Sequence, residues 1–275
     1  MNIDVGRKSA AHSANGDQPD DQEWRNTLRS SALQPLSPAG GVSIAGVDLS
    51  SPLTPAQKDA IVDAFLAHHV VVFPEQRLTR EQQFAFATNF GEVEVHGAHR
   101  GEAKRYGVAH VMTNLDAAGK PTIRVSRAGN HHWHTDKPYH PAPPLLTTLY
   151  AVEVPPAGGD TEFANMALAY DALPDATKRR IAGLRVVFRP AFDDSRPAVD
   201  HPLVRTHPDT GRKALYLGNH SSHIRDLLEA EGTALLAELL EHATQRHFVY
   251  VHRWRVGDLI MWDNRCLLHR VVAGE

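Results

Sequence analysis

The stretch Gly257-Asp-Leu-Ile-Met-Trp-Asp-Asn-Arg-Cys-Leu-Leu-His-Arg270 decides the expected fold. It begins with an apolar run of strand length, passes through the polar turn Asp263–Arg265, and continues as a second apolar run to His269. A strand that ends and reverses in this way is typical of the mouth of a β-barrel, which is where ligands gather.

Short apolar runs separated by turn residues recur along the rest of the chain, and they have the length of strands rather than of helices. The expected strands are Val42–Leu49, His69–Pro74, Tyr106–Met112, Thr122–Val125, Leu145–Val154, Leu184–Phe188, Ala214–Leu217, Phe248–His252 and Asp258–Trp262. A few helices around many short strands predict a mainly β fold with covering helices, either a barrel or a two-sheet jelly roll.

Three segments carry helix signals. Thr54-Pro55 joins an N-cap threonine to a proline in the first turn, and Thr79-Arg-Glu-Gln82 has the spacing of a capping box. Glu229–Thr244 carries leucines at helical spacing. The residues expected to face the core are Ile61, Ala64, Phe65 and Ala67 in the first helix, Phe84, Ala87 and Phe90 in the second, and Leu235, Leu236, Leu239 and Leu240 in the third.

Length and composition limit the class of protein. A chain of 275 residues with 42% hydrophobic content fits one large globular domain. Residues 1–40 are rich in small and polar types, so we expect a flexible N-terminal arm followed by one domain over residues 41–275. The net charge of −3 argues against nucleic acid as a partner, and the sequence has no apolar run of membrane-spanning length. The single cysteine fits a reducing cytoplasm, and a homo-oligomer is compatible with the sequence.

The pair His134-x-Asp136 is the strongest local signal for chemistry. Residues two apart on a strand point to the same side, so an imidazole nitrogen and a carboxylate oxygen can meet at one point. His269 would complete a set of two histidines and one carboxylate, which non-haem iron oxygenases use and which leaves metal positions open. The alternatives are a chance pair among 18 histidines and, for His269, a buried structural histidine.

A glycine pair precedes the threonine in Gly158-Gly-Asp-Thr161. The glycines permit a tight turn with positive φ, and the Thr161 hydroxyl follows at the start of the next strand, where it can donate a hydrogen bond to a carboxylate. An ordinary turn is the alternative for this segment.

These motifs occur in a fixed order. They are Trp133-His-Thr-Asp136, then Gly158-Gly-Asp-Thr161 with its threonine 25 residues after Asp136, then Trp262-Asp-Asn-Arg265 with His269 lying 133 residues after Asp136. The set resembles the taurine dioxygenase/2,4-dichlorophenoxyacetate dioxygenase (TauD/TfdA) family over roughly Val42 to Arg270. In Pro202–Arg270 the similarity is greatest to the phenoxyacetate enzymes. The resemblance implies a double-stranded β-helix (jelly roll), Fe(II) as the metal, and 2-oxoglutarate and O2 as co-substrates.

The resemblance also implies roles for single residues. The positions that match the family's iron ligands are His134, Asp136 and His269. Thr161 matches the residue that hydrogen-bonds the co-substrate carboxylate. Asn130 and His96 match positions that face the anionic substrate in the taurine enzyme, with plain loop polarity as the alternative for both.

The end of the sequence departs from the family pattern. Family members carry, beyond the distal histidine, an arginine that pairs with the far carboxylate of 2-oxoglutarate, whereas this sequence ends at Glu275. We therefore expect the C-terminal strand to be missing and the domain to be truncated. An inactive remnant that acts as a non-enzyme is one alternative that follows.

The expected function is hydroxylation of a small anionic organic substrate, an aryloxyalkanoate such as a phenoxyacetate, with release of succinate and CO2. Within the same family, the alternative substrates are taurine or another alkylsulfonate, or an alkyl sulfate. A metal hydrolase or isomerase that uses the same ligands with zinc or another divalent ion is the alternative from another enzyme class, but it gives the glycine–threonine turn and the segment Trp262–Arg265 no role.

Overall fold

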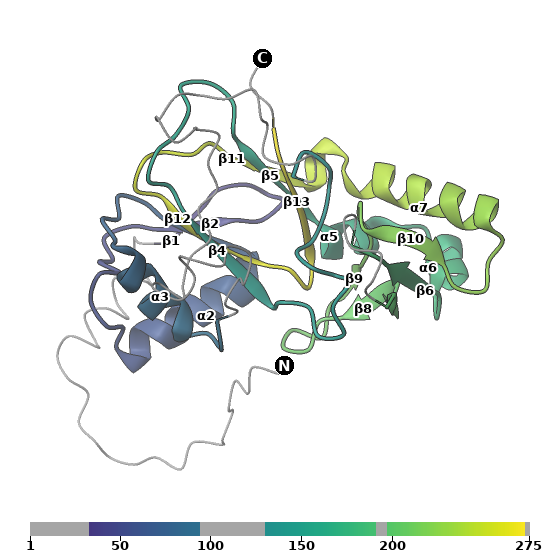
Figure 1. The fold of residues 1–275 in the computed structure, drawn as a ribbon, viewed down its shortest axis with the longest axis horizontal. Coiled ribbons are helices and arrows are strands. Elements are labelled where there is room, and N and C mark those ends of the chain that lie inside the picture. Colours follow the sequence, from purple (N-terminus) through teal and green to yellow (C-terminus); the bar gives the residue numbers. More distant parts are fainter. Residues whose placement is uncertain (1–32, 94–129, 191–196, 273–275) are drawn as a thin grey trace, which may run out of the picture.

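The computed structural model describes residues 33–93, 130–190 and 197–272, and in these residues the fold is mainly β with few helices (Figure 1). Helices α2 and α3 lie at one end, and α5, α6 and α7 lie with the smaller sheets at the other end. No helix in the described ranges has the length and apolar character that a membrane crossing requires. The strands expected at Tyr106–Met112 and Thr122–Val125 lie outside these ranges.

The larger central sheet has five strands in the order β1-β2-β3-β12-β4. Their bounds are β1 (Leu33–Pro35), β2 (Val42–Ile44), β3 (Val70–Phe73), β12 (Leu259–Asp263) and β4 (Leu146–Tyr150). β2 and β3 are parallel, and the other neighbours are antiparallel. β1 falls within residues 1–40, which the sequence assigned to an arm; it pairs with β2 because Gly40 and Gly41, with φ of 128° and 87°, reverse the chain between them.

At β3 and β12 both faces of this sheet are buried, which explains why these two strands are continuous apolar runs rather than alternating ones. Alternate residues still point to opposite faces. One set packs into the central core and consists of Val70, Val72, Ile260 and Trp262. The other set packs under the helices and consists of Val71, Phe73, Leu259 and Met261.

The second central sheet has three antiparallel strands in the order β11-β5-β13. Their bounds are β11 (Val249–His252), β5 (Thr161–Asn165) and β13 (Leu267–Val271). Only residues 264–266 separate β12 from β13, so the polar turn seen in the sequence carries the chain from one sheet to the other. The Phe163 and Trp262 rings, one from each sheet, lie 5.6 Å apart between centroids in the shared core.

Helices α2 (Pro55–His68) and α3 (Arg80–Thr88) begin where the sequence predicted, and both expected N-caps form complete capping boxes. The expected inward faces were partly wrong. Ala67 is exposed, and α3 buries Phe86 together with Phe90 rather than Phe84 and Ala87. The cause is tertiary packing, because the Phe86 ring lies edge-on against Phe73 of β3, at 5.4 Å between centroids.

The third predicted helix is confirmed as α7 (Glu229–Ala243), which buries Leu235 and Leu239 and packs beside β10. Two short helices, α5 (Met166–Ala172) and α6 (Asp175–Ile181), were not expected. α5 follows β5 directly, because the Asn165 side chain accepts hydrogen bonds from the backbone N–H groups of Ala167 and Leu168. The 3-10 turn η1 (Arg246–Phe248) leads into β11.

Two smaller sheets complete the described part of the fold, in the orders β10-β6-β7 and β8-β9. Their bounds are β6 (Arg185–Phe188), β7 (Val199–Pro202), β8 (Val204–Thr206), β9 (Lys213–Leu215) and β10 (Ser221–Ile224). The strands β7, β8 and β10 were not predicted. Their sequences VDHP, VRT and SSHI contain too few apolar residues to give a strand pattern.

Candidate metal centre

The structure brings His134, Asp136 and His269 together. An isolated antiparallel bridge joins His134 to His269, with backbone N···O distances of 3.0 and 2.7 Å for its two hydrogen bonds. Residues directly opposite each other on antiparallel strands project to the same side, and the two imidazole centroids therefore lie 4.1 Å apart. Asp136 follows two residues after His134 in a bend rather than on a strand, and its carboxylate still faces both imidazoles.

The three side chains present one donor atom each to a common point. Asp136 Oδ1 lies 4.0 Å from His134 Nε2 and 3.7 Å from His269 Nε2, and one ligand atom from each residue lies within 4.8 Å of the others. The side chains of both histidines are nearly buried, whereas that of Asp136 is 27% exposed. The described residues therefore cover the two imidazoles more completely than the carboxylate.

The ring nitrogens of both histidines are arranged in a way that suits metal binding. The Nδ1 atom of His134 lies 2.8 Å from the backbone carbonyl of His132, so Nδ1–H donates to it and Nε2 is the ring nitrogen that faces Asp136. His269 is neutral, because burial lowers its pKa to about 3. Its Nδ1 is buried and has no hydrogen-bond partner among the described residues.

Asp136 is held as a carboxylate. Burial acts to raise its pKa, but the positive charge that His269 carries when it is protonated and a hydrogen bond from the Thr147 hydroxyl to Oδ2 outweigh burial, so the pKa is lowered overall. The two oxygens thus have separate environments. Oδ2 accepts from the protein, and Oδ1 faces the histidines.

Thr161 lies on the same sheet face as His269. It is the first residue of β5 and pairs with Val271, while Phe163 pairs with His269. Thr161 is two residues from Phe163 along β5, so it points to the same face, about 7 Å from Phe163 by strand geometry. Its hydroxyl is buried and accepts a 2.9 Å hydrogen bond from Trp254 Nε1. Since indole N–H only donates, the hydroxyl proton of Thr161 is left to donate elsewhere.

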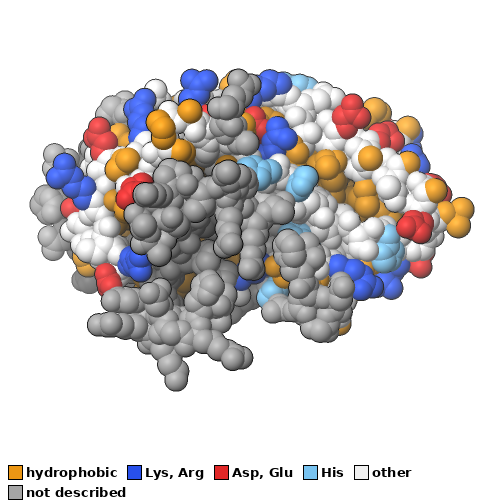
Figure 2. Space-filling model, turned by 45° about the horizontal axis from the view of Figure 1, so that its top comes forward, with side chains coloured by type: hydrophobic (Ala, Val, Ile, Leu, Met, Phe, Trp, Pro, Cys, Tyr) orange, Lys and Arg blue, Asp and Glu red, His pale blue; other side chains and the backbone are white. Residues whose placement is uncertain are grey.

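Of the two residues expected to face the substrate, the structure describes one, Asn130. Its backbone carbonyl accepts a 2.7 Å hydrogen bond from the N–H of Val271, which is two residues after His269, so Asn130 lies beside β13. His96 lies outside the described residues. Histidine side chains lie at several separate places on the face shown in Figure 2, so histidine content alone does not locate a site.

Both arginines near His269 are held by carboxylates. Arg270 Nε lies 2.7 Å from Glu162 Oε2, and its guanidinium lies over the Trp133 ring at 4.6 Å from the centroid. Arg265 bonds Asp263 and Asp209. Arg265 and Arg270 therefore form ion pairs within the protein.

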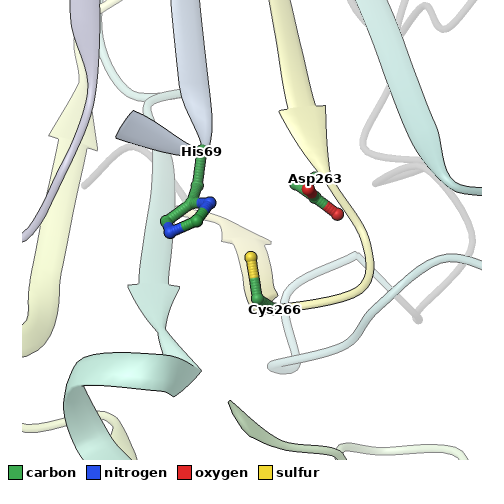
Figure 3. Close-up of side chains that lie close together, drawn as sticks. All are labelled: His69, Asp263 and Cys266. Atoms are coloured by element: carbon green, nitrogen blue, oxygen red, sulfur yellow. The ribbon is translucent and has the colours of Figure 1, made fainter. Parts of the chain in front are cut away.

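A second group of potential ligands lies in the described part of the chain, formed by His69, Asp263 and Cys266 within 4.8 Å of one another. Figure 3 shows the Cys266 thiol and the His69 ring turned toward each other, with Asp263 at the end of β12. Neither ring nitrogen of His69 has a hydrogen-bond partner in this part of the molecule. By proximity alone, this group matches the first one.

Hydrogen bonding separates the two groups. Asp263 Oδ1 accepts from the backbone N–H and Nε of Arg265, at 2.9 and 2.8 Å. Its Oδ2 accepts from Arg265 Nη2 at 2.6 Å and His207 Nε2 at 2.9 Å. A carboxylate has about four acceptor positions, so none remains for a metal. Burial raises the pKa of the Cys266 thiol, which keeps it protonated and therefore a poor ligand.

The sequence gave no indication that Thr147 belongs to the site. It placed Asn264 in the segment Trp262–Arg265 but assigned it no role of its own. Asn264 lies in the quoted turn after β12, but Thr147 lies in an apolar strand with no local signal. Their positions follow from the pairing of β12 with β4, which places Trp262 opposite Thr147.

Comparison with known proteins agrees with this geometry. The family described as "Taurine catabolism dioxygenase TauD, TfdA family" matches residues 32–274. The chain is 41% identical over 258 residues to the alpha-ketoglutarate-dependent 2,4-dichlorophenoxyacetate dioxygenase of Cupriavidus pinatubonensis, covering 86% of this chain and 90% of that protein. It is 35% identical to the (S)-phenoxypropionate/alpha-ketoglutarate-dioxygenase of Sphingobium herbicidovorans, and the match covers 88% of this chain and 90% of that protein.

A solved structure shares the fold. The crystal structure of AAD-2 in complex with Mn(II) and N-oxalylglycine matches with a TM-score of 0.79 and 38% identity, over 89% of this chain and 91% of that one. The mainly β fold with few helices predicted from the sequence is confirmed by the sheets described above. The resemblance read from the three motifs is confirmed as well, and the chain belongs to the TauD/TfdA family of 2-oxoglutarate-dependent dioxygenases.

Proposed function

We propose that this protein is an Fe(II)- and 2-oxoglutarate-dependent dioxygenase that hydroxylates an aryloxyalkanoate, such as a phenoxyacetate, and releases succinate and CO2. In this proposal His134, Asp136 and His269 hold the iron. The observation that carries it is the meeting of His134 Nε2, His269 Nε2 and Asp136 Oδ1, none of which makes a hydrogen bond to another described residue.

The donor set fits ferrous iron. Two imidazoles and one carboxylate oxygen match the two-histidine, one-carboxylate arrangement, which leaves positions for a chelating co-substrate and dioxygen. Bound iron, with 2-oxoglutarate and O2, supplies the oxidising chemistry, while the protein supplies orientation and exclusion of water. The five-stranded and three-stranded sheets, facing each other across the core, support a jelly-roll arrangement around this centre.

Thr161 has the features of a co-substrate contact. Its proton is available, because its oxygen already accepts from Trp254, and it lies on the face of β5 that carries the metal-side residues. A charge-assisted hydrogen bond from this hydroxyl would anchor a carboxylate of 2-oxoglutarate. Asn130, beside β13, and His96 are proposed to face the substrate, as the family resemblance implies.

The substrate class follows from the relatives. The names of the Cupriavidus and Sphingobium proteins specify a dichlorophenoxyacetate and a phenoxypropionate, and both are aryloxyalkanoates. Taurine or another alkylsulfonate, or an alkyl sulfate, is the second candidate, because the matching family is described by taurine catabolism. All of these substrates are small organic anions.

Anaerobic titration tests the cofactors. Addition of Fe(II) and then 2-oxoglutarate is expected to produce a visible metal-to-ligand charge-transfer band, and Asp136→Ala is expected to lose it. A wild-type protein that binds one iron and shows no such band would contradict the proposal and favour a metal hydrolase or isomerase.

A succinate-release assay tests the substrate. Phenoxyacetate, 2-phenoxypropionate, taurine and a short alkyl sulfate are compared at equal concentration, with Asp136→Ala as the blank. Stimulation by the aryloxy acids above the sulfur compounds is expected. The reverse order would favour the second candidate while leaving the reaction type intact.

A further inference from the structure

A chain of hydrogen bonds leads from the core to the rear oxygen of Asp136. The Trp262 indole Nε1 lies 3.2 Å from Asn264 Oδ1, and Asn264 Nδ2 lies 2.9 Å from Thr147 Oγ1. Thr147 Oγ1 in turn lies 2.5 Å from Asp136 Oδ2. Trp262 and Asn264 are buried, whereas Thr147 and Asp136 are partly buried, so the inner end of the chain is shielded from water.

The direction of the chain is fixed by chemistry. Indole N–H can only donate, so the atom of Asn264 that faces Trp262 is the amide oxygen. The backbone N–H of Asp136, 3.4 Å from the same atom, also requires an acceptor there. The amide nitrogen of Asn264 must then donate to Thr147, and the single proton of the Thr147 hydroxyl is left for Asp136.

We propose that Thr147 is a positioning residue that commits Asp136 Oδ2 to the protein and leaves Oδ1 alone for the metal. This inference rests on the proposed function, since it assigns Asp136 as an iron ligand. A carboxylate without such a partner can rotate and bind a metal through both oxygens. A second carboxylate bond would take a coordination position that 2-oxoglutarate or dioxygen needs.

The position of Thr147 supports the assignment. It lies on β4, opposite Trp262 of β12, and the same strand pair places the neighbouring Thr148 opposite Met261. Because successive residues point to opposite faces, Thr147 faces the metal side and Thr148 the helix-covered side. Thr148 is therefore a matched control, with the same chemistry on the same strand.

The test compares the binding of Mn(II) by Thr147→Val, Thr147→Ser and Thr148→Val. Electron paramagnetic resonance measures this binding in the absence of co-substrate. Loss of a hydrogen-bond partner behind a metal ligand typically weakens metal binding about 10–100-fold, and we expect this for Thr147→Val. Thr147→Ser keeps the hydroxyl and is expected to bind as the wild type does. Thr148→Val is expected to match the wild type too.

A second readout addresses the number of bonds that Asp136 makes. With Mn(II) at saturation, the affinity for 2-oxoglutarate is expected to fall in Thr147→Val and to stay unchanged in Thr147→Ser. Thermal unfolding of each variant shows that the fold is kept; should Thr147→Val not fold, Thr147→Ala provides the same comparison.

The outcomes separate the two proposals. Equal Mn(II) binding by wild type and Asp136→Ala would overturn the proposed metal site itself. Loss of binding in Asp136→Ala but wild-type binding in Thr147→Val would overturn only the role of Thr147. Equal losses in Thr147→Val and Thr147→Ser would overturn it as well, because the hydroxyl would then not be the group that matters.

Discussion

Among the described residues, two groups bring histidine and aspartate ligand atoms within 4.8 Å of one another, but the hydrogen bonding of their carboxylates differs. In the group of His134, Asp136 and His269, the oxygen that faces the histidines accepts no hydrogen bond from a described residue. In the group of His69, Asp263 and Cys266, four hydrogen bonds saturate the carboxylate and an arginine neutralises it. The comparison teaches that a metal site is marked by donor atoms left uncommitted, and that proximity alone does not identify one.

Removing the first carboxylate gives the largest expected effect on function. Asp136→Ala is expected to reduce substrate-dependent succinate release by more than the roughly 100-fold that follows loss of an outer-shell partner. The free energy of unfolding should change little, because the side chain is partly exposed. Turnover assays and urea unfolding check both statements, and retained hydroxylation would remove Asp136 from the metal site.

Removing the second carboxylate is expected to affect stability instead. Asp263→Asn leaves Arg265 with Asp209 as its remaining carboxylate partner, and breaking the buried pair with Asp263 is expected to cost up to about 3–5 kcal/mol. Burial acts to raise the pKa of Asp263, but hydrogen bonds from Arg265 and His207 hold it at about 2. The stabilisation is therefore present above the unfolded pKa of 3.8 and is lost as pH falls toward 2. A Tm equal to that of the wild type at neutral pH would contradict this account.

His69 makes the second group sensitive to mild acid. Burial lowers its pKa from 6.5 to about 4, so between these values the unfolded chain binds a proton that the folded chain does not. Stability should therefore fall as pH falls through this window, by about 2 kcal/mol at pH 5. Urea unfolding at pH 7 and pH 5 is expected to show a smaller loss for His69→Gln than for wild type, and parallel losses would refute the assignment.

The smallest effect is expected at Cys266. Cys266→Ala removes a buried, protonated thiol and should lower the free energy of unfolding by about 1 kcal/mol, with Mn(II) affinity unchanged. Calorimetric titration with Mn(II) and thermal unfolding measure the two quantities. A marked drop in metal affinity would show that the second group binds metal after all and would erase the contrast between the groups.

Most of the buried framework could be predicted from the sequence. The apolar runs at β3, β11 and β12 gave clear strand signals, because strands buried on both faces need apolar residues throughout. The short polar strands β7, β8 and β10 could not be found in this way, since neighbouring strands and not their own side chains specify them. The prediction of the inward face of α3 was wrong because Phe84, Phe86 and Phe90 allow two possible inward faces. Contact between Phe86 and Phe73 selects one of them.

The candidate site was predictable to a similar depth. His134 and Asp136 are two residues apart, and His269 follows a recognisable polar turn. Motifs therefore indicated all three residues that the structure brings together. Thr147 could not be found, because its function depends on the pairing of β4 with β12, and its partner Asn264 lies 117 residues away in the chain. Residues that support a ligand from a distant strand leave no pattern in the sequence around them.

The bridge between His134 and His269 has a consequence for folding. Two backbone hydrogen bonds bring together imidazoles at positions 134 and 269, far apart in the chain, and no local element can form this contact in advance. Contacts of high sequence separation close late, after the entropy of the intervening loop has been lost. Metal capture during refolding should therefore lag behind the gain of secondary structure, so that iron enters a completed protein and does not act as a template for the folding chain.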